Sequence, residues 1–220
     1  MTLPRMPWRT FAVTVAAVSM ALPAIASPYR VTIDTVPLLS QAGYMAFDFV
    51  AGSPATGNAA VVSSFASNAT LGSASSSGGA SGSLSAGPLT LGGGPFFSEW
   101  LQGVVAFGSS IVFDIELGAA VSPGGVPDEF SFFLLDANQL PFATADPTGA
   151  GALFYFDLTG TSTAPVIFAS DFASVTIEPL VVGNVPEPAT LLLLLAGLAV
   201  VLRLSRAGQR RPTVLPAAPC

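Results

Sequence analysis

The sequence contains no histidine and no lysine, and its single cysteine is the last residue, Cys220. Without histidine, the common zinc-ligand sets and the usual base that activates a serine or cysteine nucleophile are absent. A single cysteine cannot close a disulfide within the chain, so a folded domain must be stabilised by packing. These absences exclude most metalloprotease and triad-hydrolase chemistries, and they leave aspartate and glutamate as the available acid/base groups.

Positive charge lies almost entirely at the two ends of the chain. All seven cationic residues are arginines, and only Arg30 falls between residues 27 and 184. The same segment holds twelve carboxylates, which give it a net charge of −11. Because a surface of this sign repels phosphate backbones, we expect no nucleic-acid binding. A cation or a neutral polysaccharide is the favoured kind of partner.

The N-terminus has the pattern of a secretory signal peptide. Arg5 and Arg9 precede an apolar run from Phe11 to Leu22. Ala24 and Ala26 then supply small residues at the two positions that a signal peptidase recognises. The run of twelve residues is too short for an ordinary membrane-spanning helix. We therefore predict a signal peptide over residues 1–26, with cleavage after Ala26.

A second apolar segment, near the C-terminus, predicts one transmembrane helix. Residues 189–202 include five consecutive leucines and offer no polar face to solvent. These fourteen residues rise about 21 Å as a helix, a marginal span that flanking residues extend to 189–204. The basic cluster that follows predicts a cytoplasmic tail, and so places the preceding domain outside the cytoplasm. Its members are Arg203, Arg206, Arg210 and Arg211.

Immediately before this helix lies the motif Val185-Pro186-Glu187-Pro188. Its two prolines block helix formation and hold the segment extended, the form that processing enzymes commonly bind. The motif, the leucine-rich helix and the arginines together resemble the PEP-CTERM sorting signal of Gram-negative bacteria. The resemblance covers residues 185–211 and implies that an inner-membrane exosortase recognises the motif and cuts near it, sending the domain to the cell surface or the exopolysaccharide matrix. Residues 212–220 form a tail longer than the family's usual short basic end.

Residues 27–184 are predicted to form one all-β domain, a β-sandwich of jelly-roll-like type. Many short strands separated by glycine and proline turns favour that architecture. Six segments alternate between apolar and polar residues with the two-residue period of half-buried strands. They are Val31–Asp34, Tyr44–Val50, Ile111–Leu117, Phe130–Asp136, Leu153–Leu158 and Ser174–Glu178. Phe130–Asp136 is apolar on both faces, which indicates a central strand.

Two other segments have different patterns. Apolar side chains recur at helical spacing after Pro95, which predicts a short helix ending at Gly103. The residues with this spacing are Phe97, Trp100, Leu101 and Val104. Residues 67–87 are rich in serine, glycine and alanine, which predicts a mobile loop or an edge hairpin.

The domain also resembles a small class of PEP-CTERM proteins that begin with Val-Thr-Ile-Asp-Thr soon after the signal peptide. Here these residues are Val31–Thr35. Phe130–Asp136 and Ala152–Leu158 are similar to strands of that class. The resemblance implies a single-domain exported protein and no particular chemistry.

Catalysis in this domain would need paired carboxylates, as glycoside hydrolysis does. Asp114 and Glu116 point to the same face of their predicted strand, with side chains about 7 Å apart. The solvated face of an amphipathic strand gives the same pattern, and this interpretation also covers Asp34, Asp48 and Asp157. We predict no catalytic residue.

Metal and sugar sites remain open alternatives. Residues 128–129, 136–138 and 146–149 offer carboxylates for calcium, although such residues also form turns by bonding their own backbone. We predict no metal ligand and no cofactor, and calcium is the one alternative left open. Sugar binding uses exposed aromatic side chains, and Tyr155 shares a predicted strand face with Leu153 and Asp157. The other amphipathic aromatic residues are Tyr29, Tyr44 and Trp100.

The sequence thus predicts an exported, non-enzymatic protein of the cell surface or extracellular matrix. Its expected partners are an exosortase, the inner membrane before processing, and exopolysaccharide. The alternatives are a carboxylate-dependent glycosidase and a calcium-stabilised carbohydrate-binding module.

Overall fold

The computed structural model describes residues 28–53, 57–94, 96–118, 125–159 and 164–180. These residues form eleven β-strands and one 3-10 turn, η1 (Val36–Leu38). The strands are β1 (Tyr29–Asp34), β2 (Gly43–Val50), β3 (Ala59–Ser67), β4 (Thr70–Ser77), β5 (Leu89–Gly92), β6 (Phe97–Ala106), β7 (Ser110–Leu117), β8 (Asp128–Leu135), β9 (Phe154–Leu158), β10 (Pro165–Ile167) and β11 (Ser174–Pro179). No helix in this part of the chain is long and apolar enough to cross a bilayer. The signal peptide, the sorting motif, the transmembrane helix, the basic cluster and the tail are predicted at residues 1–26 and 185–220, outside the described residues.

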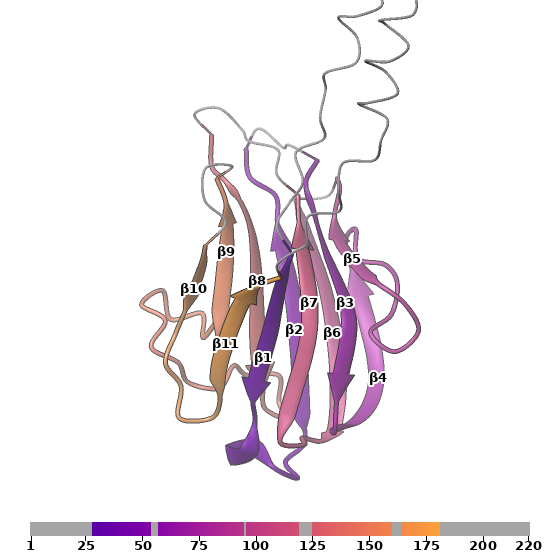
Figure 1. Ribbon diagram of the computed structural model, residues 1–220, viewed down its shortest axis with the longest axis vertical. Coiled ribbons are helices and arrows are strands. Elements are labelled where there is room, and N and C mark those ends of the chain that lie inside the picture. The colour runs from indigo at the N-terminus through magenta and orange to yellow at the C-terminus, as the bar shows by residue number, and fades with distance from the viewer. Residues whose placement is uncertain (1–27, 54–56, 95, 119–124, 160–163, 181–220) are drawn as a thin grey trace, which may run out of the picture. The chain divides into compact units, whose positions relative to one another are not determined.

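The strands form two antiparallel sheets that pack face to face as a β-sandwich (Figure 1). The β1 sheet has the strand order β11-β1-β7-β3-β5, and the β2 sheet has the order β10-β9-β8-β2-β6-β4. From β1 to β8, successive strands alternate between the two sheets, as in a jelly roll. The predicted all-β sandwich is confirmed. All six predicted strands are present, and β8 lies between β9 and β2, as expected for a strand that is apolar on both faces.

Phenylalanine side chains from both sheets form the centre of the core. Phe113 on β7 lies 5.4 Å from Phe47 on β2 and 5.6 Å from Phe132 on β8, measured between ring centroids. Phe132 also lies 4.9 Å from Phe47 and 5.5 Å from Phe154 on β9. All four rings have no exposed surface. This aromatic cluster joins the two sheets, because Phe113 belongs to one and the other three belong to the other.

The predicted helix after Pro95 is wrong, because this segment is strand β6. The backbone of β6 pairs with β2 along one edge and with β4 along the other, which satisfies its N–H and C=O groups. Trp100 pairs with the buried Phe47, whereas Leu101 pairs with Ala46 and points to the opposite face. The helical spacing therefore arose from large side chains on both faces of one strand.

Residues 67–87 contain an edge strand, so the prediction of a mobile loop is wrong. Asn68 and Ala69 connect β3 to β4, but these strands belong to opposite sheets and do not pair as a hairpin. The register between β4 and β6 shifts on both sides of Leu71, and the Gln102 side chain donates a hydrogen bond to the Gly72 carbonyl (2.9 Å). Leu84, in the loop after β4, is buried in the core.

Candidate functional site

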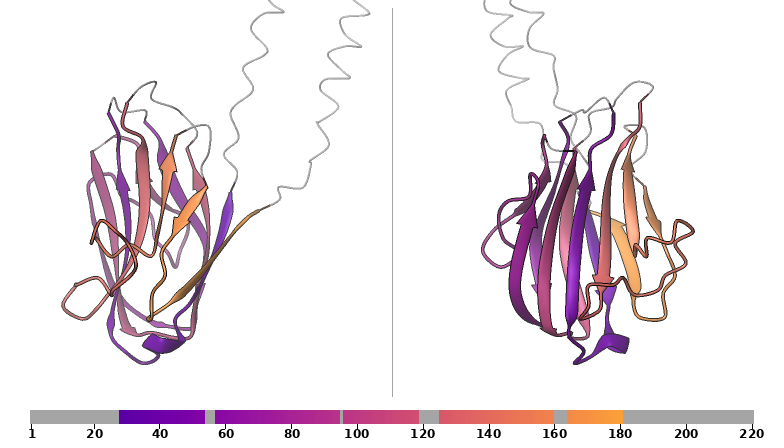
Figure 2. Two further views of the ribbon diagram at one scale, coloured as in Figure 1. Left: turned by 90° about the vertical axis from the view of Figure 1, so that its left-hand side faces the viewer. Right: turned by 180° about the vertical axis from the view of Figure 1, so that it is seen from behind.

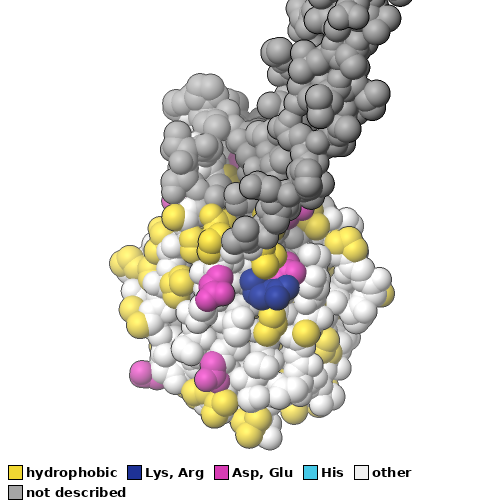
Figure 3. All heavy atoms as spheres, in the orientation of Figure 1, with side chains coloured by type: hydrophobic (Ala, Val, Ile, Leu, Met, Phe, Trp, Pro, Cys, Tyr) yellow, Lys and Arg dark blue, Asp and Glu magenta, His cyan; other side chains and the backbone are white. Residues whose placement is uncertain are grey.

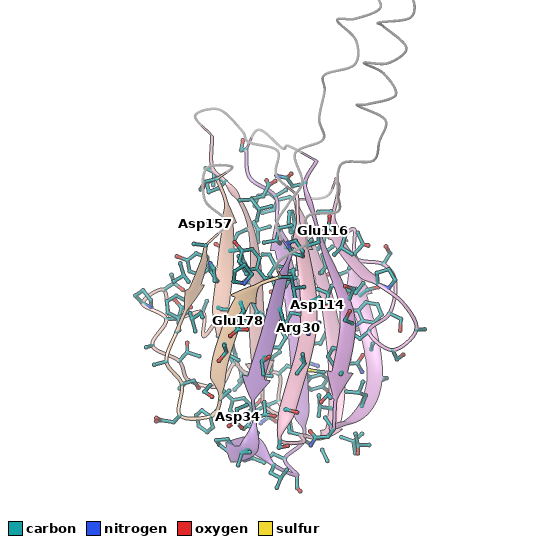
Figure 4. All side chains as sticks on the ribbon, in the orientation of Figure 1. Arg30, Asp34, Asp114, Glu116, Asp157 and Glu178 are labelled. Carbon is teal, nitrogen blue, oxygen red and sulfur yellow. The ribbon has the colours of Figure 1, made fainter. Side chains whose placement is uncertain are left out.

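The outer face of the β1 sheet carries Arg30, the one cationic side chain among the described residues (Figure 3). Its Nε and a terminal amine donate hydrogen bonds to the two carboxylate oxygens of Asp114, at 2.8 and 3.0 Å. Glu178 occupies the register position on the other side of Arg30, on β11 (Figure 4). The hydrogen bonds from Arg30 lower the pKa of Asp114, so that this carboxyl stays ionised.

Asp114 and Glu116 share the outer face of β7, as predicted, but the ion pair makes Asp114 a poor proton donor. An inverting or retaining glycosidase needs one carboxyl group with a raised pKa as its general acid. Asp34 is exposed and accepts a hydrogen bond from the backbone N–H of Val36 (2.9 Å), which fits the predicted solvated strand face. This face therefore has the properties of an ordinary solvated surface.

The outer face of the β2 sheet brings together four carboxylates from four neighbouring strands. Figure 2 (right) shows the ribbon from behind, with this sheet toward the viewer. Asp48 on β2 is directly opposite Glu99 on β6, and Glu129 on β8 is directly opposite Asp157 on β9. The two pairs lie in adjacent rows, because Asp48 is also opposite Ser131, two residues from Glu129. We call this surface the acidic face. Its members are Asp48, Glu99, Glu129 and Asp157, with Ser131, Tyr155 and Phe97 between and beside them.

Burial and mutual repulsion perturb the carboxylates of the acidic face. Burial, and then the charges of Glu99 and Glu129, raise the pKa of Asp48 to about 7. Burial and the charge of Asp157 raise the pKa of Glu129. Burial also raises the pKa of Asp157. Like charges directly opposite one another destabilise a sheet, and Arg30, the one described cation, lies on the other sheet.

Asp48 departs from the predicted solvated strand position. Its side chain is largely buried, and the buried atom Oδ1 has no hydrogen-bond partner. The reason is its place in the sheet, since β2 is flanked by β8 and β6 and its outer face is covered by the side chains of its neighbours. An unpaired polar atom in such a place lowers stability by about 1–3 kcal/mol.

We expect the Asp48→Asn variant to be more stable than the wild type at pH 8. The pKa of about 7 lies above the ordinary 3.8, so the native state holds a proton that the unfolded chain releases. The stability due to this proton is full below the ordinary pKa and is lost as the pH rises through about 7. One pKa unit corresponds to about 1.4 kcal/mol, and the expected gain at pH 8 exceeds that amount.

Urea unfolding of both proteins between pH 4 and pH 8 measures this effect. The difference between them should shrink toward pH 4, where the native aspartyl group is neutral. Glu116→Gln, which removes the same charge from the exposed outer face of the other sheet, is the matched control and should change the unfolding midpoint little. Equal gains from the two variants at pH 8 would assign the effect to net charge instead of to Asp48.

The residues considered for calcium lie in different settings. Asp136 accepts bonds from the backbone N–H groups of Asn138 and Leu140, at 2.8 and 2.9 Å. Asp146 accepts four bonds from a turn of its own loop, two of them from Thr148. These two residues act as turn formers.

Asp128 and Glu129 lie in β8 instead of a turn. Asp128 accepts hydrogen bonds from the backbone N–H of Gly52 and from the side-chain amide of Asn58, whereas Glu129 lies on the acidic face. Within the described ranges, no group of three or more acidic or thiol side chains is placed to hold a metal ion.

The aromatic residues divide between the core and the acidic face. Tyr155 lies on the acidic face beside Asp157, as predicted, whereas Leu153 precedes β9 and is buried. Phe97, assigned from the sequence to a helix, is 40% exposed, two residues from Glu99 on the same face of β6. The remaining three are placed as follows: Tyr29 packs on Phe156, Trp100 faces inward, and Tyr44 lies on the outer face of β2.

Comparison with known proteins identifies the C-terminal signal. Residues 184–211 match the model of the PEP-CTERM protein-sorting motif, which confirms the predicted signal at 185–211. The chain is thus an exported protein that is sorted by an exosortase. Val185, Pro186, Glu187, Pro188 and the four arginines lie within the matched residues. Their individual roles stay predictions, as do those of Ala24 and Ala26. Neither the curated proteins nor the solved structures include a match to the chain.

Proposed function

We propose that the mature protein is a non-enzymatic component of the cell surface or extracellular matrix, and that its acidic face binds exopolysaccharide. The observation that carries the proposal is the gathering of four carboxylates, from Asp48, Glu99, Glu129 and Asp157, on the outer face of four neighbouring strands. Carboxylates accept hydrogen bonds, and the hydroxyl groups of a sugar are abundant donors. Glu99, Glu129 and Asp157 are partly exposed, so their carboxylates can accept such bonds from a sugar on this face.

The aromatic residues of the acidic face support the same proposal. Tyr155 on β9 and Phe97 on β6 lie at opposite ends of the four strands that carry the carboxylates. With neighbouring strands about 4.8 Å apart, these strands span about 14 Å. An elongated polysaccharide laid across these strands would contact an aromatic ring at each end and carboxylates between the two rings. Such a mixture of apolar and polar groups is typical of binding sites.

Charge narrows the class of polysaccharide to neutral ones. The segment from residue 27 to residue 184 has a net charge of −11, and no described cation lies on the acidic face. An anionic polysaccharide would be repelled over distances up to the Debye length, about 8 Å at physiological salt. Neutral polysaccharides, which are rich in hydroxyl groups, are not repelled in this way.

The alternative of a carboxylate-dependent glycosidase gains support from one observation. Asp48 has a pKa of about 7 and lies near Glu99 and Glu129, and a carboxyl with such a raised pKa can act as a general acid. Polysaccharide binding and glycoside hydrolysis would use the same surface, so only an assay of sugar release distinguishes the two functions. Neither proposal invokes calcium, and the turn carboxylates Asp136 and Asp146 accept backbone hydrogen bonds of their own loops.

A glycan array combined with a reducing-sugar release assay tests the proposal. We expect the protein to bind neutral glycans, to bind anionic ones weakly, and to release no sugar. Glu129→Gln should weaken binding about tenfold or more, which corresponds to about 1.4 kcal/mol. Glu116→Gln should bind as the wild type does. Sugar release that Asp48→Asn abolishes would establish the glycosidase instead, and unchanged binding by Glu129→Gln would remove the acidic face from consideration.

A further inference from the structure

Strand β4 leaves one backbone edge open. It is the last strand of the β2 sheet and pairs only with β6 among the described strands. Its eight residues are exposed except for the half-buried Leu71, so no loop of the described chain covers it. The N–H and C=O groups on the outer edge of such a strand form a template for another strand.

The other three sheet edges carry features that discourage strand addition. Strand β10 has only three residues and begins with Pro165, and β11 contains Glu178 and ends at Pro179. Strand β5 is covered, because Thr90 exchanges two backbone hydrogen bonds with Ser81, at 2.8 and 2.9 Å. By contrast, β4 is long, uncharged and free of proline. Proteins protect their edges with short strands, charges, prolines, β-bulges and covering loops, and of these β4 has only the register shifts on either side of Leu71, which leave Ala74–Ser77 regularly paired with β6.

We propose that the β4 edge pairs antiparallel with β4 of a second copy of this chain, so that the two β2 sheets join into one continuous sheet. The occupant is a second copy because its β4 offers the same uncharged open edge, so no like charges meet at the contact itself. The segment from residue 27 to residue 184 has a net charge of −11, so two copies repel each other over most of their surface, but β4 brings no charged side chain to the contact. Small serine, glycine and alanine side chains also let two backbones approach without steric conflict. The pairing is isologous, because each copy contributes the same strand.

This pairing has a consequence for the acidic face. The two-fold axis that relates two antiparallel β4 strands is perpendicular to the joined sheet. The outer faces of both β2 sheets therefore point to the same side. The joined sheet would therefore present two acidic faces to the same polysaccharide. Two linked sites bind a repeating polymer more tightly than one, without any new contact. The self-association itself does not depend on whether the acidic face binds sugar.

Cysteine cross-linking of the full chain tests the β4 pairing. With Cys220 replaced by serine, cysteines are introduced one at a time at positions 73–77 and the exported protein is oxidised. We expect a disulfide-linked dimer from at least one position, because facing residues near the two-fold axis have Cα atoms within the 4.4–6.8 Å that a disulfide needs. Thr176→Cys, on the exposed edge strand β11, is the matched control and should stay monomeric. Equal cross-linking at β4 and at Thr176 would overturn the proposal, as would cross-linking of β4 to a different protein.

A charge variant gives an independent measurement. Ser75→Lys places a cation in the middle of β4, and facing lysines in the two copies would repel. We expect analytical ultracentrifugation of the full chain in detergent to show a dimer fraction at least tenfold lower for Ser75→Lys than for Thr176→Lys. Dimerisation through the C-terminal segment would instead give the same dimer fraction in both variants. Since Ser75 is exposed, an unchanged urea midpoint should accompany the loss of dimer. A dimer fraction that is the same in both variants would contradict pairing through β4.

Discussion

Replacing Phe132 with alanine is expected to lower the free energy of unfolding by about 3–5 kcal/mol, the usual cost of removing a buried aromatic side chain. Phe132 has no exposed surface and contacts rings from both sheets, at 5.6 Å from Phe113 and 4.9 Å from Phe47. Its removal leaves a cavity in the aromatic cluster that joins the sheets. Urea unfolding of the mature protein, followed by circular dichroism, measures the loss.

Phe96→Ala provides the control for this variant. Phe96 is 71% exposed and lies just before β6, so its removal should change the free energy of unfolding by no more than about 0.5 kcal/mol. A Phe132→Ala protein as stable as Phe96→Ala would mean that the sheets are held together elsewhere. With no disulfide available in the chain, packing of this kind must supply the stability.

The strands with strong alternation were predictable from the sequence, and those without it were not. In β7, Phe113 and Ile115 face the core while Asp114 and Glu116 face outward, which is the pattern that identified the strand. Strands β3, β4 and β5 are built largely from alanine, serine, glycine and a few aliphatic residues, so their alternation is faint. The segment Phe97–Ala106 was misassigned because large side chains on both faces imitate helical spacing.

The candidate site was only partly predictable, because it depends on which strands are neighbours. The outward direction of Asp114 and Glu116 follows from a single strand. The opposition of Asp48 to Glu99 follows from pairing between β2 and β6, which are far apart in the sequence. Asp48 was expected to be solvated, since a two-residue period says nothing about the side chains on the adjoining strands. The ion pair between Arg30 and Asp114 could not be predicted for the same reason, because it depends on the pairing of β1 with β7.

The core of the described residues lies entirely before the C-terminal signal. It runs from Val31 to Ala173, and the last described strand, β11, ends at Pro179. The matched sorting motif begins at residue 184. A cut near Pro186–Pro188 would therefore remove no residue of this described core, and we expect the released domain to keep its stability.

Replacing both Pro186 and Pro188 with alanine is expected to abolish release of the protein from the inner membrane. The wild type should lose residues 1–26 and everything beyond a cut near Pro186–Pro188. Alanines at the two positions allow the following helix to extend backward through Glu187, which removes the extended segment that a processing enzyme binds. Intact-mass measurement of the protein from the membrane, the cell surface and the medium distinguishes cut from uncut chains.

Pro179→Ala is the matched control for this experiment, because it removes a proline from the end of β11, outside the sorting motif. It should be cut and released as the wild type is. A strain without the exosortase should retain the uncut wild-type chain in the membrane, since the arginines from Arg203 to Arg211 hold the tail in the cytoplasm. Wild-type protein that keeps Cys220 in both strains would mean that the C-terminal segment is a permanent anchor, since the Pro-Glu-Pro motif would then direct no cleavage.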